Sequence, residues 1–198
     1  GSIYKGRIQN VIPGMQAAFV DIGYELNSFL PFSEIGNTDN LKNLSFDEDD
    51  DKKRVHKKPK ASYKDLKVND DILVQVIKEP FSGKGPRVTT DISIPGSLMV
   101  LVPNENYIGI SRKIKDKYEK RRLRKIAETL KPEGFGLIIR TIAKGLEEEK
   151  LKADYSRVWK TWKLVESKSK TKKSPYVVYK DFDTSEQVVR DLFTSDIS

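Results

Sequence analysis

The feature that most constrains the fold of this sequence is a series of short β-type segments within its first ninety residues. Five runs rich in aliphatic, aromatic and β-branched side chains occupy residues 3–8, 17–23, 28–31, 71–77 and 87–92. Turn signals separate them: a Pro-Gly pair follows the first run, a glycine ends the second, and a Gly/Pro-rich stretch precedes the fifth. Five short strands with one long excursion predict a small closed β-barrel.

The excursion covers residues 37–64 and consists almost entirely of polar side chains. It holds an acidic run over 47–51, followed directly by a basic run over 52–60. Segregated charge with few apolar anchors is typical of chain that does not pack into a core. The sequence therefore predicts a charged, mobile insertion at about 37–64.

The second half of the chain has a different pattern, in which strands alternate with helices. Strand-like runs are expected at 97–102, 136–140 and 176–179, and helical spacing is expected at 115–130, 146–168 and 185–193. Trp159 and Trp162 fall on the apolar stripe of the second helix, so they are interpreted as core residues rather than as a platform for stacking bases. This order predicts a small α/β unit after the barrel, and an α+β chain overall.

Composition narrows the classes of function. The 198 residues include no cysteine and one histidine, His56, which excludes a disulfide framework and makes thiolate or histidine metal sites and histidine catalysis unexpected. No run approaches eighteen apolar residues, and the N-terminus lacks a basic-then-apolar leader. We expect a soluble, cytoplasmic protein with no membrane partner.

The positive charge is concentrated in one segment. The net charge is +8, and residues 112–125 carry nine basic side chains against Asp116 and Glu119. A focused positive field indicates a polyanionic partner. The alternative is a solvated helix face whose lysines only increase solubility.

The run Gly136-Leu137-Ile138-Ile139-Arg140-Thr141 ends an apolar strand with an arginine and a hydroxyl. A guanidinium group can hold two phosphate oxygens at once, and a hydroxyl can bind a third. The Arg-Thr pair alone is weak evidence for a phosphate site, since most such dipeptides lie on protein surfaces. Beside a barrel and a basic segment, it indicates a protein that holds RNA and inspects its 5′ end.

The first ninety residues resemble an S1 RNA-binding domain of the OB-fold type. The resemblance is carried by four runs, Tyr4-Lys5-Gly6-Arg7-Ile8, Ala18-Phe19-Val20-Asp21-Ile22-Gly23, Phe29-Leu30-Pro31-Phe32-Ser33-Glu34-Ile35 and Asp70-Asp71-Ile72-Leu73-Val74-Gln75-Val76. The whole chain resembles the N-terminal half of the ribonuclease E/G endoribonucleases. Further matches are Val88-Thr89-Thr90, Pro95-Gly96, Leu101-Val102-Pro103-Asn104, Gly109-Ile110-Ser111-Arg112, the run 132–141 and Arg190-Asp191-Leu192-Phe193.

The resemblance implies an S1 barrel over 1–92, a 5′-sensor α/β subdomain over 93–174 and the start of an RNase H-like segment over 175–198. It also implies a Mg²⁺-dependent endoribonuclease that cleaves single-stranded RNA in RNA processing and decay, with a homo-oligomeric full-length protein. The carboxylates that hold Mg²⁺ in that family are expected outside this chain, so no catalytic residue, metal ligand or cofactor is expected here. Four acids near the end do not match those family positions and are interpreted as surface residues: Asp181, Asp183, Asp191 and Asp196.

The family pattern assigns roles to eight residues of this sequence. Those implied to contact RNA are Phe19, Phe29, Lys84 and Arg112. Those implied to bind a 5′-monophosphate are Gly96, Val100, Arg140 and Thr141. From periodicity alone, the two phenylalanines could equally be barrel core.

Three functions are therefore weighed. The first is an RNA-binding and 5′-monophosphate-sensing part of a ribonuclease E/G-type enzyme, acting on single-stranded RNA. The second is a non-catalytic S1 binding module of the translation or RNA-chaperone type, which leaves residues 112–125 and 136–141 without a purpose. The third, an intact enzyme that uses the terminal aspartates, is the least favoured.

Overall fold

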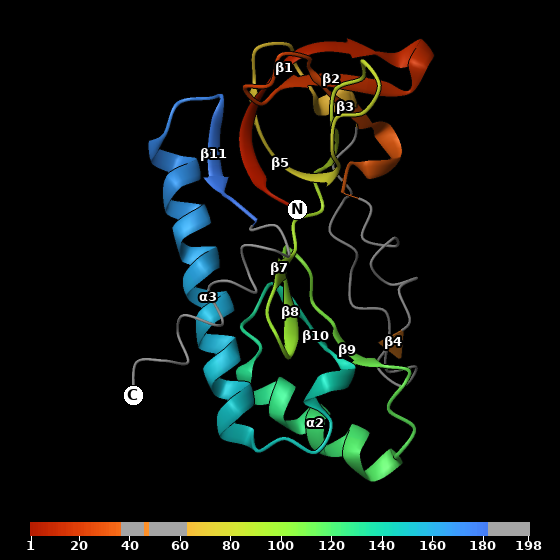
Figure 1. The fold of residues 1–198 in the computed structure, drawn as a ribbon, viewed down its shortest axis with the longest axis vertical. Helices are drawn as coiled ribbons and strands as arrows, with labels where there is room; N and C mark the ends of the chain where they lie inside the picture. The colour runs from red at the N-terminus through yellow and green to blue at the C-terminus, as the bar shows by residue number, and fades with distance from the viewer. Residues whose placement is uncertain (37–45, 48–62, 182–198) are drawn as a thin grey trace.

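The computed structural model describes residues 1–36, 46–47 and 63–181. It consists of a barrel and a second sheet, which lie one above the other in Figure 1 with two helices packed beside the second sheet. The helix predicted at 185–193 and most of the insertion at 37–64 lie outside the described residues.

The barrel is closed by five strands in the order β1-β2-β3-β6-β5, with β5 returning to β1. The strands are β1 (Ile3–Ile12), β2 (Ala17–Asp21), β3 (Ser28–Pro31), β5 (Asp71–Lys78) and β6 (Arg87–Thr89). All pairs are antiparallel except β3 with β6. The predicted OB-type barrel is confirmed.

Along each barrel strand, side chains alternate between the interior and the outer surface. Its interior holds small and branched apolar side chains, including Ala18, Val20, Leu30, Val74 and Val88. Every second residue of a strand faces the same side, so residues between these must face outward.

The second sheet has the order β4-β9-β10-β8-β7. Its strands are β4 (Phe46–Asp47), β7 (Ile94–Pro95), β8 (Met99–Pro103), β9 (Ile108–Ser111) and β10 (Phe135–Ile139). β10 is parallel to β9 and antiparallel to β8. Because β9 and β10 run in the same direction, their C-terminal ends meet at one edge.

Two helices pack against this sheet. Helix α2 (Lys117–Leu130) buries Leu123, Ile126 and Ala127, and its N-cap Asp116 accepts hydrogen bonds from the backbone N–H of Tyr118 and Glu119. The tryptophans of helix α3 (Glu148–Thr171) pack against the core of the second sheet, both edge-on to Phe135. The prediction that they are core residues is confirmed.

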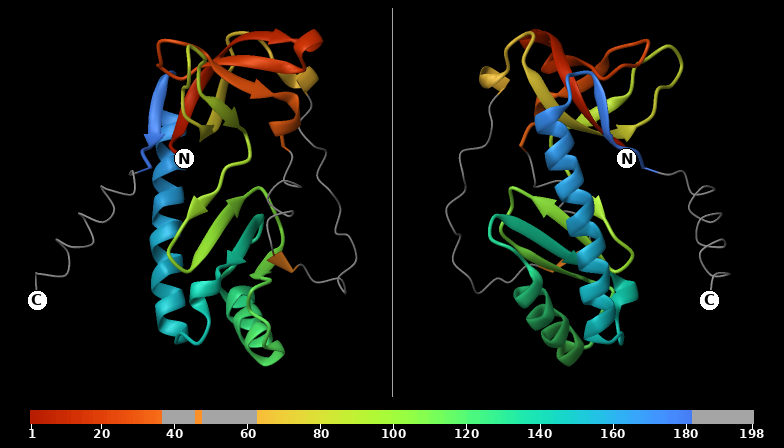
Figure 2. Two further views of the ribbon diagram at one scale, coloured as in Figure 1. Left: turned by 45° about the vertical axis from the view of Figure 1, so that its right-hand side comes forward. Right: turned by 90° about the vertical axis from the view of Figure 1, so that its left-hand side faces the viewer.

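Helix α3 runs beside both halves of the molecule and leads into the barrel sheet (Figure 2). It continues to Thr171, three residues past its predicted end, and Glu166 pairs there with both Lys163 and Lys170 across successive turns. The strand predicted at 176–179 forms as β11 (Tyr176–Tyr179), and it pairs with β1 rather than with the second sheet.

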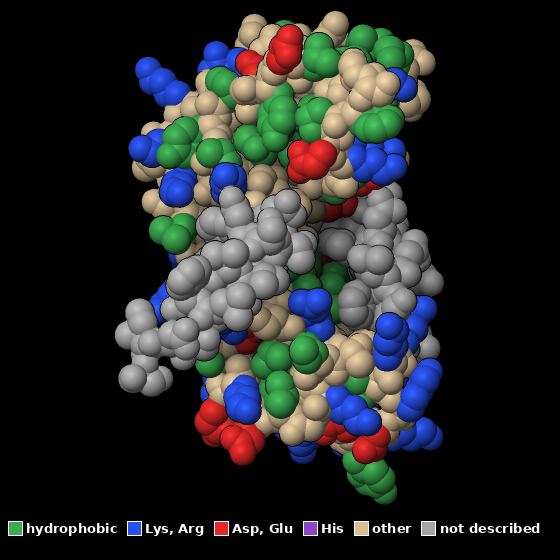
Figure 3. All heavy atoms as spheres, in the orientation of Figure 1, with side chains coloured by type: hydrophobic (Ala, Val, Ile, Leu, Met, Phe, Trp, Pro, Cys, Tyr) green, Lys and Arg blue, Asp and Glu red, His purple; other side chains and the backbone are tan. Residues whose placement is uncertain are grey.

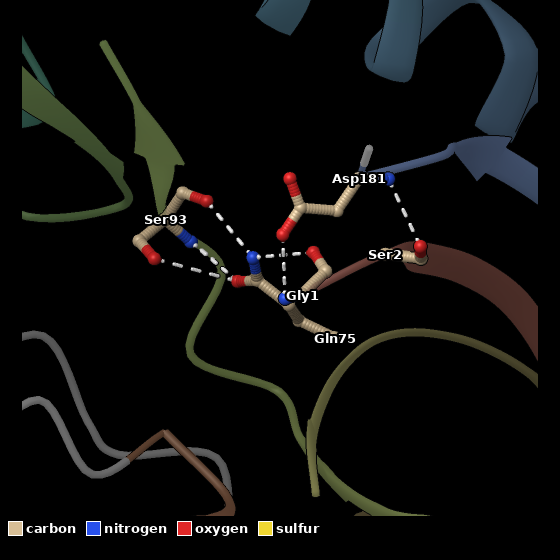
Figure 4. Close-up of polar contacts among 5 residues, drawn as sticks. All are labelled: Gly1, Ser2, Gln75, Ser93 and Asp181. Carbon is tan, nitrogen blue, oxygen red and sulfur yellow. Dashed lines mark hydrogen bonds and ion pairs between the residues drawn. The ribbon is translucent and has the colours of Figure 1, made fainter. Parts of the chain in front are cut away.

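The junction between the two halves is held by a buried amide, that of Gln75 (Figure 4). Its Nε2 donates to the carbonyls of Gly1 and Ser93, each at 3.0 Å, and its Oε1 accepts from the Ser93 N–H at 2.8 Å. The Asp181 N–H donates to the Ser2 hydroxyl nearby. Strand β5, the chain leaving the barrel and the chain returning to it are thus fastened at one point.

Within the described ranges, no helix is both long and apolar enough to cross a membrane.

Candidate nucleic-acid interface

An aromatic pair lies on the outer surface of the barrel. Phe19 on β2 and Phe29 on β3 are direct cross-strand partners, with ring centroids 5.9 Å apart at 62°. Both are half-buried, and neither belongs to the barrel core, which their neighbours Ala18, Val20 and Leu30 fill. Two outward rings side by side form a surface on which bases can stack, each stack contributing roughly 1–3 kcal/mol.

The loop that carries Lys84 is fixed against the start of β3. Phe81 and Lys84 exchange backbone hydrogen bonds at 3.0 and 3.2 Å, and the Phe29 N–H donates to the Pro86 carbonyl at 2.8 Å. A Cβ on Gly85 would lie 2.1 Å from the Asn27 carbonyl oxygen, so only glycine permits this approach. The exposed Lys84 therefore stands one residue from a rigid contact with the strand of Phe29.

Two residues that sequence reasoning missed belong to the same region. Arg87 is the parallel partner of Phe29 on β6, and its Nη2 lies 3.2 Å from Glu34 Oε1. Phe81 is 82% exposed at the tip of the Lys84 loop. The signal for Arg87 was its place at the start of a predicted strand; the exposure of Phe81 required the loop geometry.

A second group of side chains gathers where β9 and β10 end. The Arg140 backbone N–H donates to the Leu98 carbonyl at 2.9 Å, and its Nη1 donates to the Gly96 carbonyl at 2.8 Å. In the part of the chain that the structure describes, its guanidinium group forms no ion pair and no other hydrogen bond. Since arginine carries five N–H donors, most of them are left for a ligand at this exposed corner.

Thr141 completes the corner with a hydroxyl. Its Oγ1 lies 2.7 Å from the Oγ of Ser111, the last residue of β9, and Arg112 follows Ser111 directly as an exposed side chain. Val100 lies on β8 between its partners Pro95 and Ile138. Gly96 and Arg140 therefore touch, and Thr141 follows Arg140 in the chain. Val100 lies on the neighbouring strand β8, and Arg112 directly follows β9.

A buried carboxylate, which the sequence analysis did not single out, shapes this corner from behind. Asp154 of α3 is 1% exposed and accepts hydrogen bonds from the backbone N–H groups of Ser97, Leu98 and Met99 at 3.1, 2.8 and 3.2 Å. Arg157 Nη2 donates to Asp154 Oδ1, the oxygen that also accepts from Ser97, at 2.8 Å. The turn after Gly96 is thus bound to α3 by three hydrogen bonds to one side chain.

Gly96 is required by the same contact. A Cβ at this position would lie 2.5 Å from Asp154 Oδ2 and 2.7 Å from Val158 Cγ1. The sequence signal for Asp154 was its position, an acid three residues after Leu151 and four before Val158 on the apolar stripe of the helix.

The segment after Thr141 is fastened to α2 by an ion pair. Glu119 accepts from the Gly145 N–H at 2.8 Å and from Arg122, while Arg122 Nη2 donates to the Leu146 carbonyl at 3.0 Å. The hydrogen bonds from Arg122, reinforced by the one from Gly145, lower the pKa of Glu119 to about 2. The corner therefore rests on α2 on one side and on α3 on the other.

No set of three or more histidine, cysteine, aspartate or glutamate side chains among the described residues is arranged to hold a metal ion. Asp181 has its N–H bonded to Ser2, and Asp183, Asp191 and Asp196 lie outside the described residues.

Comparisons with known proteins identify the family of this chain. The family model described as the Ribonuclease E/G family matches residues 93–198. The chain belongs to the ribonuclease E/G family. It is 34% identical over 199 residues to ribonuclease E of Synechocystis sp., covering 100% of this chain and 27% of that protein.

Ribonucleases G are similar to the same extent. That of Salmonella typhimurium is 35% identical over 192 residues, which are 97% of this chain and 38% of the relative. That of Haemophilus influenzae is 39% identical over 171 residues, which are 86% of this chain and 33% of the relative. The chain thus spans well under half the length of these family members, and the family expected from its motifs is confirmed.

Proposed function

We propose that this chain is the part of a ribonuclease E/G-type enzyme that holds single-stranded RNA and reads the phosphorylation state of its 5′ end. The observation that carries the proposal is the corner at the end of β10. There an exposed guanidinium group is oriented by the Gly96 carbonyl, and the next residue in the chain, Thr141, pairs its hydroxyl with that of Ser111.

The chemistry of this corner suits a terminal phosphate. A terminal monophosphate carries about −1.5 to −2 charges and three exposed acceptor oxygens, whereas an internal phosphodiester carries one charge. Arg140 supplies several donors and a full positive charge, and the two hydroxyls supply a further donor. Such a site binds the end of a strand more tightly than its middle.

The barrel supplies the second half of the proposal. Phe19 and Phe29 would stack bases. Lys84 and Arg87 would lie near the phosphates that link those bases. Arg112, which leaves β9 beside Thr141, would contact RNA at the corner. Binding through these groups is indifferent to the 5′ group, so affinity and end selectivity are expected to reside in different residues.

For the whole protein, we propose Mg²⁺-dependent cleavage of single-stranded RNA in the cytoplasm, in RNA processing and decay, by a homo-oligomer. In keeping with the family resemblance, the metal-binding carboxylates are proposed to lie outside this chain. We therefore expect that the 198 residues alone bind RNA without cleaving it, which incubation with RNA and Mg²⁺ tests directly.

The decisive experiment compares oligonucleotides that differ only at the 5′ end. Equilibrium affinity is measured for one single-stranded sequence carrying a 5′-monophosphate, a 5′-hydroxyl or a 5′-triphosphate. The parent chain should prefer the monophosphate, and Arg140→Ala should lose that preference while it still binds 5′-hydroxyl RNA. Lys150→Ala, which removes an exposed cation from α3, is the matched control and should behave like the parent.

A non-catalytic S1 module remains the second candidate, because the barrel alone would suffice for it. Such a module should bind the three RNAs equally, and Arg140→Ala should change nothing.

A further inference from the structure

The outward side of α2 carries a stripe of positive charge. Lys117, Lys120, Arg121 and Arg124 line one surface hollow. Their spacing of three, four and seven residues places them on one side of the helix over two turns. On the face drawn in Figure 3, lysine and arginine side chains gather over the end of the molecule that holds α2.

An aromatic ring stands beside this stripe. Tyr118 is 83% exposed, more than any other exposed large hydrophobic side chain in the described ranges. Its backbone N–H is bonded to the N-cap Asp116, so the first turn that carries it is well formed. Arg121 and Lys125 follow it at three and seven residues, which places both on the same side of the helix as the ring.

Among the described residues of α2 and its cap, the acidic side chains nearest the first two turns are engaged elsewhere. Glu119 turns toward the corner, where Arg122 and the Gly145 N–H bind it, and Asp116 is engaged as the cap. Glu128 follows one turn after Arg124, at the far end of the stripe. The first two turns therefore present a positive field next to a solvated ring.

We infer that this side of α2, with its stripe of cations and Tyr118, is a further binding site for single-stranded RNA. The cations would bind phosphates of the RNA body, and Tyr118 would stack one base. The inference rests on the proposed RNA-binding function but assigns a surface that the end-sensing corner does not include. A positive groove combined with an exposed aromatic is the arrangement that binds single strands without regard to sequence.

The position of α2 supports RNA over another polyanion. The helix follows Arg112 in the chain, and through Glu119 and Arg122 it holds the segment that comes after Thr141. An RNA whose 5′ phosphate lies at Arg140 thus has α2 as an immediate neighbour. An acidic protein would be attracted by the cations, but its side chains would not stack on the ring.

The test removes the charges and measures the salt dependence of binding. In the quadruple α2 variant, four cations are each changed to Gln: Lys117, Lys120, Arg121 and Arg124. The control changes four other exposed lysines to Gln in the same way: Lys150, Lys160, Lys173 and Lys180. Each phosphate contact adds roughly 0.7 to the slope of log affinity against log salt on single strands. The α2 variant should lose about 1.5–3 from this slope, and the control should lose much less.

The ring is tested separately. Tyr118→Ala should weaken binding of a long single-stranded oligonucleotide by about tenfold, within the range measured for one stacked base. Tyr118→Phe keeps the ring and should bind like the parent. Equal loss in the two variants would overturn the stacking role.

The outcomes separate this inference from the proposed function. If the α2 variant binds 5′-hydroxyl and 5′-phosphate RNA more weakly by the same factor, the inference is supported. If it matches the charge control, or if polyglutamate displaces RNA from the parent as well as an RNA of equal charge does, the inference is overturned. A parent without any end preference but with α2-dependent affinity would overturn the end-sensing function alone.

Discussion

The barrel surface and the corner at the end of β10 are built in opposite ways. Phe19 and Phe29 are direct partners on neighbouring strands, and regular alternation along those strands turns both outward. Arg140, in contrast, is oriented by the carbonyl of Gly96, 44 residues away, and the turn after Gly96 donates its backbone N–H groups to a carboxylate on α3. The first surface follows from local pattern, whereas the second depends on contacts between distant segments.

This difference predicts how each region responds to substitution. A substitution on the barrel surface removes one contact and leaves the scaffold intact, because the barrel core lies beneath it. A substitution behind the corner shifts the Gly96 turn, and with it the partner of Arg140. Binding strength and end selectivity should therefore respond to different substitutions, and the following experiments break or sharpen that contrast.

The largest effect is expected from Asp154→Ala. The change leaves three backbone N–H groups and Arg157 without their acceptor, and we expect the free energy of unfolding to fall by roughly 3–5 kcal/mol. Urea unfolding measures this loss. Asp154→Asn keeps one acceptor oxygen and should lose less stability, yet its preference for 5′-monophosphate RNA should also fall. Full preference in a folded Asp154→Asn chain would contradict the positioning role.

Gly96→Ala should have the next largest effect. Its methyl group would overlap Asp154 and Val158, and forcing the turn away from α3 should cost about 1–3 kcal/mol of stability. The ratio of affinities for 5′-monophosphate and 5′-hydroxyl RNA should fall with it. Gly14→Ala is the matched control, since a Cβ there meets nothing within 4 Å.

Phe19→Ala tests the barrel surface. Losing one stacking ring should weaken binding of 5′-monophosphate and 5′-hydroxyl RNA alike, by roughly 1–3 kcal/mol, with little change in unfolding. Ile77→Ala, which removes an exposed apolar side chain from β5, is the control and should bind both RNAs like the parent. A selective loss for one of the two RNAs would mean that the barrel also senses the end.

The smallest effect concerns the pH dependence of stability. The pKa of Glu119 is lowered to about 2 in the folded chain, against about 4.3 when unfolded, so its contribution is complete above pH ~4.3 and is lost as pH falls toward 2. Glu119→Gln should lower the melting temperature by about 2–4 °C at neutral pH, which is the shift that about 1 kcal/mol produces in a chain of this size. This difference from the parent should therefore shrink below pH ~4.3. Glu128→Gln, on the opposite side of α2, is the control, and a constant difference would argue against the ion pair.

Much of the fold could be predicted from pattern. The five barrel strands, α2 and β10 were expected within a few residues of their observed bounds. Strand β9 was missed because Ile108–Ser111 is short and contains a glycine, so only its pairing with β10 defines it. The joining of β11 to β1 was also unforeseen, since partner choice depends on where α3 delivers the chain.

The candidate site was predictable in part. Its residues came from a family resemblance, and their roles remain predictions. Chemistry alone indicated Arg140 and Thr141 as a phosphate pair, but no local pattern connects Gly96 with Asp154 over 58 residues. The charged insertion at 37–64 was expected to be mobile, and apart from β4 and the stacking of Tyr63 on Phe32 it lies outside the described residues.

Helix α3 has a consequence for the length of RNA that the chain can grip. At about 1.5 Å per residue, its 24 residues form a rod of roughly 36 Å, with Asp154 near one end and the strand that joins β1 beyond the other. Because α3 packs on the second sheet and leads into the barrel sheet, it helps to hold the proposed phosphate-binding corner at a constant distance from the proposed stacking surface. Oligonucleotides too short to cover that distance can occupy either place but not both, so affinity should rise in a step once the strand is long enough.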